Sequence, residues 1–387
     1  KPMDRTNNKF TGVIVVFGVA TVFLAILYVV DMNSESLGFA QWLNSKRILK
    51  EHKLSIRKIL TKNPDFKSVD KEKYIEEAQS LIAMKGKRNL GDWVSYRSFT
   101  PNIKGAYITT NDFGLRSEID LKNMILRAQS NKKQGKKNIL LLGGSTAFGL
   151  GSTEDSKSIS SLLNSALIED GFEVFNLAQG GYTSFMQLFM LGNIGIHFQS
   201  DMIVILDGYS DIYHLAYKPK GGEMTLGLWD HHEEKMDPSF VFNLYYKNLA
   251  TIGKLGAALG NEIIYALQPI SGFENNSLLE VDKIEKLWAL YPKVREVTQL
   301  AALENNATFL DLTQSFKKEN NSEINFYDKS HLSDTGQRKL ADILLKEIRA
   351  LSQRKKRSPT SLENREAAIN TILTKDYSGK YKTARDY

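Results

Sequence analysis

The stretch Asn138-Ile-Leu-Leu-Leu142-Gly-Gly-Ser145-Thr-Ala-Phe-Gly149 joins an uninterrupted apolar run to a glycine-rich turn that carries a serine. The apolar run is typical of a strand that is buried on both faces, as in a parallel sheet. The glycines let the chain turn sharply after the strand and leave the serine hydroxyl exposed at the sheet edge. The stretch therefore predicts a strand of a parallel sheet with Ser145 just beyond its carboxyl end.

Four more short apolar runs follow, and the segments between them are long enough to hold crossover helices. These runs are Glu173–Leu177, Met202–Leu206, Glu262–Leu267 and Thr308–Leu312. Alternation of this kind predicts an α/β fold, a three-layer sandwich around a five-stranded parallel sheet. Ligands bind such sheets at the carboxyl ends of the strands, so we expect the site in the loops after Leu142, Leu177 and Leu206.

Taken alone, the glycine-rich loop after the first strand is ambiguous. It could be a structural turn, or it could cradle a phosphate. Neither the Gly-Lys-Ser/Thr ending of a phosphate-binding loop nor the Gly-x-Gly-x-x-Gly spacing of a dinucleotide site is present around Ser145, which disfavours the phosphate reading.

A second polar motif lies near the end of the predicted domain, in Tyr327-Asp-Lys-Ser-His331-Leu-Ser333, before a helix expected to begin near Asp334. Activation of a serine needs an imidazole within hydrogen-bond reach, and that imidazole needs an acceptor that fixes its tautomer. An aspartate three residues earlier in the same loop can be that acceptor. The pattern therefore predicts Asp328 and His331 as partners of Ser145.

With these residues identified, the segment from about Asn138 to Arg349 resembles the SGNH (GDSL-like) hydrolases. That family has a Ser after the first strand, a Gly after the second, Gly-x-Asn-Asp after the third and a final Asp-x-x-His. The resemblance implies a flavodoxin-like fold and a catalytic triad. The matching positions are Ser145, Gly181, the stretch Asp207-Gly208-Tyr209-Ser210-Asp211, Asp328 and His331.

One position departs from the family pattern, because Ser210 stands where the family has its Asn. The resemblance implies an oxyanion hole made of the N–H groups of Ser145 and Gly181 and the side chain at position 210. A serine hydroxyl is shorter than an asparagine amide, and loss of one such donor costs about 10²–10³ in rate. We also expect Tyr209, Asp211 and His214 to bind substrate, under a variable loop over Ala216–Pro238.

The segment Phe10–Val30 is twenty-one residues without a charge. As a helix rising about 1.5 Å per residue it would cross the roughly 30 Å hydrocarbon layer of a membrane. A cleaved signal peptide is the alternative, but no small-x-small site follows Val30. Because basic residues precede the span and Asp31 and Glu35 follow it, we predict a single-pass protein with a cytoplasmic N-terminus and an extracytoplasmic main domain.

The sequence predicts five parts, namely residues 1–9 in the cytoplasm, a membrane helix over 10–30, a charged helical connector over 31–92, the hydrolase-like domain over 93–351 and a basic tail over 352–387. The chain contains no cysteine, which excludes disulfides and thiolate chemistry. The net charge is +7, but no stretch of the chain interleaves basic residues with aromatic ones as an RNA-binding sheet would. No nucleic-acid partner is therefore expected. No cofactor or metal is expected either, since neighbouring residues such as His231-His-Glu-Glu234 do not converge on one ion.

The resemblance implies a serine esterase that removes ester-linked acyl or acetyl groups from a glycan, lipid or envelope polymer. An O-acetyltransferase would use the same triad. A different class stays open, in which the fold serves as a weakly active or inactive subunit or binding module of a membrane assembly, with other membrane proteins as partners.

Overall fold

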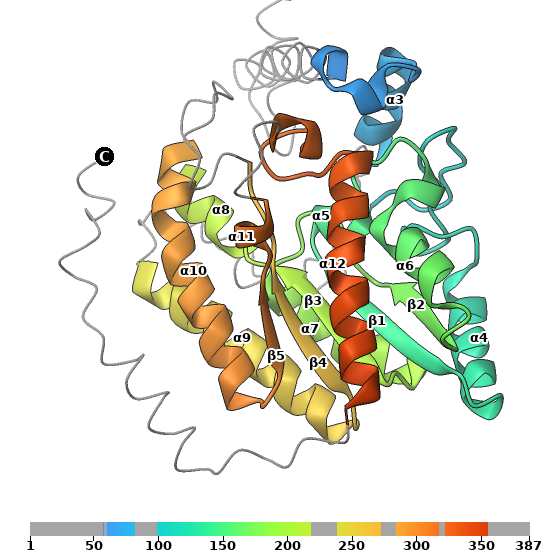
Figure 1. The fold of residues 1–387 in the computed structure, drawn as a ribbon, viewed down its shortest axis with the longest axis vertical. Helices are drawn as coiled ribbons and strands as arrows, with labels where there is room; N and C mark the ends of the chain where they lie inside the picture. Colours follow the sequence, from blue (N-terminus) through green and yellow to red (C-terminus); the bar gives the residue numbers. More distant parts are fainter. Residues whose placement is uncertain are drawn as a thin grey trace, which may run out of the picture. The chain divides into compact units, whose positions relative to one another are not determined.

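The computed structural model describes Arg57 and residues 60–81, 99–217, 238–271, 284–316 and 322–354. In these ranges the chain forms a parallel five-stranded sheet with the strand order β2-β1-β3-β4-β5 (Figure 1). The strands are β1 (Lys137–Gly143), β2 (Phe172–Asn176), β3 (Met202–Asp207), β4 (Glu262–Leu267) and β5 (Thr308–Asp311). The order changes direction between β1 and β3, which is where sheets of this kind bind their ligands.

Helices cover both faces of the sheet, as Figure 1 shows with α12 and α6 crossing in front of the strands. The principal helices are α3 (Lys71–Ser80), α4 (Leu121–Lys133), α6 (Ile159–Leu167), α7 (Ser184–Asn193), α8 (Ser210–Tyr217), α9 (Pro238–Ala258), α10 (Ile284–Glu304) and α12 (Asp334–Gln353). Two single-turn helices follow β1 and β5, namely α5 (Ser145–Phe148) and α11 (Leu312–Ser315). Short 3-10 helices are η1 (Pro64–Phe66), η3 (Asp155–Lys157), η4 (Gly195–Phe198) and η6 (Ser322–Asn325).

Successive side chains of each strand point to opposite faces, so the sheet has two apolar cores. Leu140 and Leu142 of β1 belong to the core shared with α4, α7, α9 and α10. Ile139 and Leu141 belong to the other core, shared with α6 and α12. Burial on both faces explains why the strands lack polar alternation and could be recognised as continuous apolar runs.

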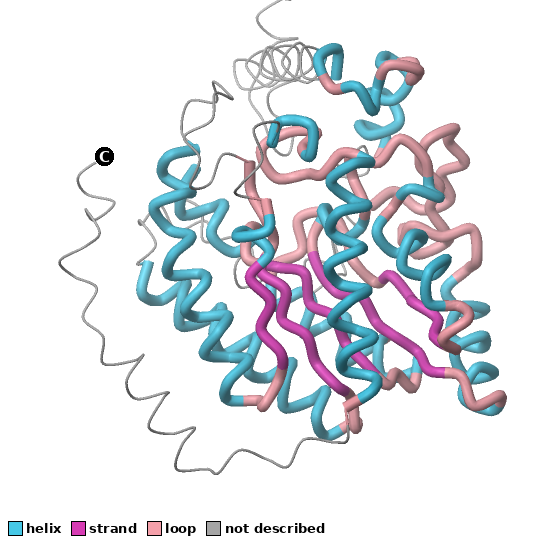
Figure 2. Tube along the Cα trace, in the orientation of Figure 1, coloured by secondary structure: helices cyan, strands magenta, loops and turns pink. Residues whose placement is uncertain are grey.

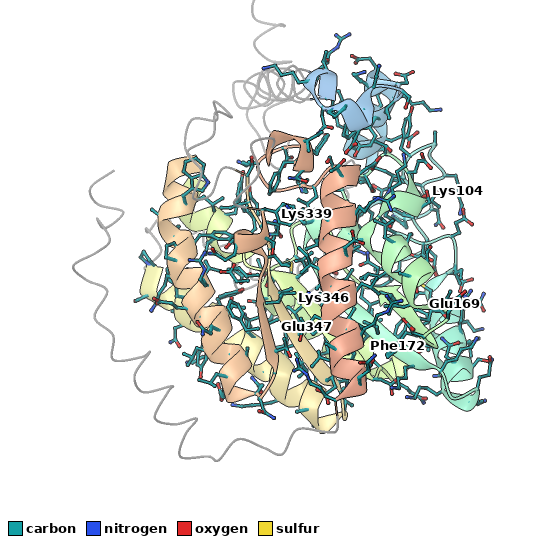
Figure 3. All side chains as sticks on the ribbon, viewed as in Figure 1. Lys104, Glu169, Phe172, Lys339, Lys346 and Glu347 are labelled. Atoms are coloured by element: carbon teal, nitrogen blue, oxygen red, sulfur yellow. The ribbon has the colours of Figure 1, made fainter. Side chains whose placement is uncertain are left out.

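The sequence of helix α12 fixes where the helix begins and which of its faces packs on the sheet, and so positions the loop before it. Its cap is Ser333, whose hydroxyl accepts a hydrogen bond from the N–H of Gly336 at 3.3 Å. Leu340, Leu344 and Ile348 recur at helical spacing and are buried. Charged side chains such as Lys346, drawn in Figure 3, lie on the opposite, exposed side. One face of the helix is therefore fixed on the sheet just after His331.

The fold class predicted from the sequence is confirmed. Each strand begins and ends within one residue of its predicted bounds, and α12 begins at Asp334 as expected. In Figure 2 the loops gather at one end of the strands, above the carboxyl end of the sheet. Of the predicted site residues, Gly181, Tyr209, Asp328 and His331 lie in those loops. Ser145 begins the short helix α5, and Ser210, Asp211 and His214 lie in α8.

The described part of the predicted connector differs from the expectation of a separate stalk. The described residues from Leu60 onward belong to one compact unit with the sheet. Leu60, Phe66 and Tyr74 are completely buried there. The rings of Phe66 and Tyr74 pack on Tyr327, in the loop that precedes α12. The described residues 60–81 thus pack with the sheet, while the boundary expected between residues 92 and 93 lies outside the described residues and stays a prediction.

Among the residues that the structure describes, no helix is both long and apolar enough to cross a membrane. The span predicted at Phe10–Val30 lies outside the described residues, as does the predicted tail beyond Arg354.

Candidate active site

Ser145 is the first residue of α5 and lies directly beyond β1. The chain reaches it through Gly143, which has a φ of 154°. A Cβ at Gly143 would stand 2.4 Å from the carbonyl oxygen of Leu206 on the neighbouring strand β3. Glycine is therefore required for the turn that places Ser145, partly exposed, at the carboxyl end of the sheet.

The structure brings together Ser145, His331 and Asp328. The Ser145 Oγ lies 2.6 Å from Nε2 of His331. The other ring nitrogen, Nδ1, lies 2.7 Å from Oδ2 of Asp328. If Nδ1 carries the ring proton and donates it to the carboxylate, Nε2 is free to accept the proton of the serine hydroxyl.

The second carboxylate oxygen of Asp328 is also bonded, because Oδ1 accepts the N–H groups of Ser330 and His331, each at 2.8 Å. Burial by itself raises the pKa of Asp328, but the neighbouring His331 and these hydrogen bonds outweigh it and lower the pKa to about 2. The carboxylate therefore stays ionised at neutral pH and can orient an imidazole.

Three contacts from the sheet side fix the loop that carries Asp328 and His331. Thr146, the residue after the serine, donates its hydroxyl to the carbonyl of Ser330 at 3.0 Å. The amide of Gln268 donates to the same carbonyl at 3.2 Å. The N–H of Ser271 donates to the carbonyl of Lys329 at 2.9 Å. The loop is thus tied both to α5 and to the chain after β4.

The residues expected to form an oxyanion hole come from three loops that meet at Gly144. A Cβ at Gly144 would stand 3.1 Å from Oγ of Ser210 and 3.6 Å from the carbonyl oxygen of Tyr182. Gly181, the residue before Tyr182, has a φ of 72°, which favours glycine. The turns after β1, β2 and β3 therefore lie in contact, with Ser210 next to the residue that precedes Ser145.

One of the expected substrate-binding residues is wrong. The carboxylate of Asp211 is completely buried and accepts hydrogen bonds from the N–H and the hydroxyl of Ser184, at 2.9 and 2.6 Å. It fastens α8 to the first turn of α7 and is not available to a ligand. Asp211 follows Ser210 in the chain, but consecutive helical residues point in different directions, so the two side chains do not share one environment.

Tyr209 is partly exposed, and its ring lies 5.7 Å from the ring of Tyr213. The ammonium of Lys329, from the loop of Asp328, lies over that second ring at 5.2 Å. His214 belongs to α8, but its side chain lies outside the described residues, as do His231-His-Glu-Glu234 and most of the predicted variable loop.

A second buried carboxylate lies beneath this region. Asp207, the last residue of β3, is 4% exposed, and its Oδ2 has no hydrogen-bond partner among the described residues. Burial and the nearby charge of Asp211 raise the pKa of Asp207 well above its ordinary value. Burial also raises the pKa of Asp211, to about 6, against the hydrogen bonds from Ser184. The two groups are unfavourable neighbours when both are ionised.

Sequence reasoning missed several residues of the segment before α4. The N–H of Phe99 donates to the side chain of Gln179 at 2.7 Å, and the ring of Phe99 lies against Gly180, where a Cβ would be only 2.1 Å away. The guanidinium of Arg116 pairs with Asp155 at 2.7 Å and donates to the carbonyl of Gly149. These contacts stabilise the turns after β1 and β2. They could not be predicted, because no local sequence pattern indicates which distant residues will meet.

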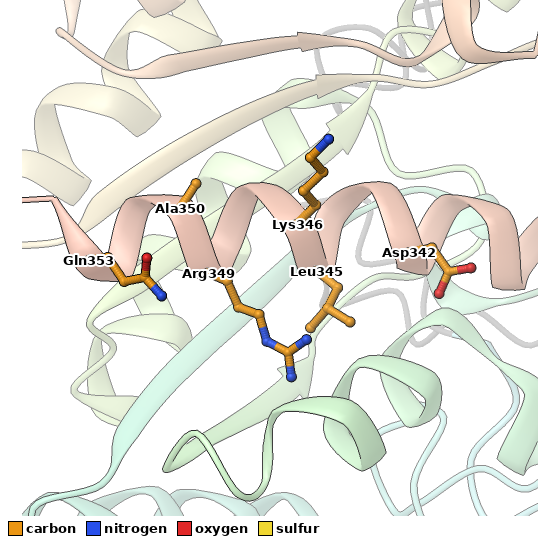
Figure 4. Close-up of a pocket in the computed structure, with 6 residues that line it drawn as sticks. All are labelled: Asp342, Leu345, Lys346, Arg349, Ala350 and Gln353. Carbon is orange, nitrogen blue, oxygen red and sulfur yellow. The ribbon is translucent and has the colours of Figure 1, made fainter.

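A shallow pocket of about 470 Å³ lies elsewhere, along the outer side of α12 (Figure 4). Its lining residues all belong to that helix, from Asp342 to Gln353. Asp342 is eight residues into the helix, or about 12 Å from its start next to His331 at 1.5 Å per residue. The pocket is separate from the candidate active site.

No protein-family model matches the chain. No curated protein sequence matches it either. The solved structures to which it is similar include the acetyl xylan esterase AlAXEase, at 17% identity and a TM-score of 0.40, over 55% of this chain and 99% of that chain. A lipase/acylhydrolase from Enterococcus faecalis is similar at 16% identity and a TM-score of 0.40, over 58% and 99% of the two chains. A variant of an acetyl-xylooligosaccharide esterase from Geobacillus Stearmophilus is similar at 18% identity and a TM-score of 0.42, over 57% and 97%.

Proposed function

We propose that this chain is a serine hydrolase of the SGNH (GDSL-like) class that cleaves ester-linked acyl groups. The observation that carries the proposal is the hydrogen-bonded chain from Ser145 through His331 to Asp328, with distances of 2.6 and 2.7 Å. A serine, a histidine and an ionised aspartate in this order form the arrangement that activates a hydroxyl for attack on a carbonyl.

In the proposed reaction, Ser145 Oγ attacks the ester carbonyl carbon while His331 Nε2 takes the hydroxyl proton. The resulting imidazolium is stabilised by Asp328. His331 then returns the proton to the leaving alcohol, which leaves an acyl group on Ser145. A water molecule, activated by the same imidazole, attacks the acyl-enzyme and releases a carboxylic acid and the free serine.

The negative oxygen of each tetrahedral intermediate needs donors, and the proposed ones are the N–H groups of Ser145 and Gly181 and the hydroxyl of Ser210. The position of Ser210 next to Gly144 supports its inclusion. Because the hydroxyl is short, the proposal includes a weaker oxyanion hole than an asparagine would give.

We further propose that the substrate is a glycan, lipid or envelope polymer outside the cytoplasm, and that Phe10–Val30 anchors the chain. The support is the uncharged length of that segment and the charge difference across it. Transfer of the acyl group to a sugar hydroxyl, in place of water, would use the same residues and is the second candidate reaction.

A fluorophosphonate probe tests the proposal, because it reacts with activated serines. The full-length chain is incubated with the probe and the modified peptide is identified by mass spectrometry. Labelling at Ser145 that disappears in Ser145→Ala and His331→Ala supports a working triad. Absence of labelling in the wild-type chain would support the alternative, a subunit or binding module that has kept the fold without the activity.

A further inference from the structure

The side chain of Asn63 joins the start of the described chain to the loop before α12. Its amide nitrogen donates to the carbonyls of Ile324 and Phe326, at 3.2 and 3.1 Å. Its amide oxygen accepts the N–H of Asp65 at 3.0 Å and so caps η1. Asn63 is 6% exposed, and both ends of its amide are used. The orientation of the side chain is therefore fixed.

The same turn also contacts the chain on the far side of His331. The carboxylate of Asp65 accepts the N–H and the hydroxyl of Thr335, at 2.8 and 3.0 Å. In Figure 1 the segment that ends in α3 lies next to the first turn of α12. Asn63 thus holds the chain before Asp328, and Asp65 holds the chain after His331.

Aromatic contacts fill the space between these two attachments. The rings of Phe66 and Tyr74 each lie 5.8 Å from the ring of Tyr327, which precedes Asp328 in the chain. The ring of Tyr327 in turn lies 6.3 Å from that of His331. The Tyr74 hydroxyl accepts the N–H of Gly151 at 3.1 Å.

The contact with Gly151 leads back to the same loop. A Cβ at Gly151 would stand 2.3 Å from the carbonyl oxygen of Leu332, the residue after His331. A shift of Gly151 would therefore move the chain next to the imidazole. Tyr74 itself is completely buried, so it has no room to follow such a shift without repacking.

We propose that Asn63 and Tyr74 are positioning residues, which hold the loop of Asp328 and His331 in register with Ser145. This inference rests on the proposed function, and it makes the segment over residues 60–81 a working part of the site. The sheet-side contacts hold the loop at Lys329 and Ser330. Within the loop, Ser333 bonds the carbonyls of Ile324 and Asn325, and Phe326 pairs with Leu332. Asn63 adds the bonds that tie Ile324 and Phe326 to the chain outside the loop. A misplacement of reacting groups by about 1 Å can cost about 10² in rate.

The test uses the full-length chain with Asn63→Ala, Asn63→Asp and Tyr74→Phe. Asn63→Asp can keep the cap on Asp65 but cannot donate to Ile324 and Phe326. The matched control is Asn138→Ala, because Asn138 is also buried and its amide donates to two backbone carbonyls, those of Ala128 and Phe198, at 2.8 and 2.9 Å. That residue is the second of β1, near the end of the strand opposite Ser145.

Two quantities are measured, the rate of fluorophosphonate labelling at Ser145 across pH and the low-field proton resonance of the hydrogen bond between His331 and Asp328. The resonance is assigned by its loss in His331→Gln. We expect the Asn63 variants to label about 10- to 10²-fold more slowly than wild type, with a shifted pH profile and a moved or broadened resonance. Tyr74→Phe should show a smaller effect of the same kind. Asn138→Ala should lower the melting temperature and leave the pH profile and the resonance unchanged.

The inference is overturned if Asn63→Asp keeps the wild-type labelling rate, pH profile and resonance, because Asn63 would then be a cap alone. It is also overturned if Asn63→Ala and Asn138→Ala alter the resonance equally. If Asn63→Ala does not fold, Tyr74→Phe decides by the same readouts. If the wild-type chain is not labelled at all but the resonance responds as expected, the positioning role stands and the proposed hydrolase function fails.

Discussion

The hydroxyl oxygen of Ser210 lies 3.1 Å from the point where a Cβ of Gly144 would stand. Ser210, which stands where the proposed SGNH class has an Asn, therefore lies next to the turn that delivers Ser145. A longer side chain at position 210 has Gly144 as its neighbour, which carries no side chain to obstruct it.

On the proposed function, Ser210→Asn should raise turnover on a model acyl ester by up to about 10²–10³, because the longer asparagine amide can reach the negative oxygen of the intermediate. The gain should appear in kcat rather than KM, since the donor acts in the transition state. The double variant with Ser145→Ala is the control and should be inactive. A slower Ser210→Asn would instead mean that the native hydroxyl is already the better donor.

Asp328→Asn should reduce the labelling rate of Ser145 by up to about 10⁴, because an amide cannot hold the imidazole in the required tautomer. Ser145→Ala and His331→Ala should abolish labelling, while the fold is retained in circular dichroism. Asp170→Asn is a suitable control, since Asp170 pairs with Arg349 on the exposed side of α12. Equal hydrolysis by the wild type and Ser145→Ala would refute the hydrolase proposal.

The buried pair of Asp207 and Asp211 should make stability fall as pH rises. Their folded-state pKa values lie above the ordinary 3.8, so their contribution to stability is fully present below that pH. The contribution of Asp211 is lost as pH rises through about 6, and that of Asp207 as pH rises through its own raised pKa. Asp328 has its pKa lowered to about 2, so its ionised form stabilises the fold above pH 3.8. That contribution to stability is lost as pH falls from 3.8 towards 2.

Asp207→Asn should therefore raise the free energy of unfolding by roughly 1–3 kcal/mol at alkaline pH, above the raised pKa of Asp207, where the buried carboxyl would otherwise be charged. Near the ordinary pKa of 3.8 the difference should be small, because the native carboxyl is protonated there. Urea unfolding at both pH values measures this, with Asp342→Asn as an exposed control. The same gain at both pH values would show that charge is not the cause.

The proposed topology predicts that a protease added to intact cells cleaves the main domain from the non-cytoplasmic side. The physical reason is the excess of basic residues before Phe10–Val30 and of acidic ones after it. Immunoblotting of the protected fragment is the measurement, and a cytoplasmic protein is the control for cell integrity. Cleavage that occurs only after lysis contradicts the topology.

The sheet could be predicted because its strands are buried on both faces, which leaves continuous apolar runs such as Asn138–Leu142. Ser145, Asp328 and His331 could be found because each lies in a short motif with its own chemistry. The contact between Asn63 and Phe326 could not, since 263 residues separate the partners and neither belongs to a repeating pattern. Asp211 was misassigned because its burial depends on α7, which packs against it only in the folded chain.

The contact between Phe99 and Gly180 has a consequence for how this protein can change in evolution. The ring occupies the volume that any side chain at position 180 would need, so the two positions can vary only together. Homologues with a side chain at position 180 should carry a small residue at position 99 or lack that segment. In an alignment of homologues, covariation between positions 99 and 180 would show which relatives also pack the segment before α4 against the turn after β2.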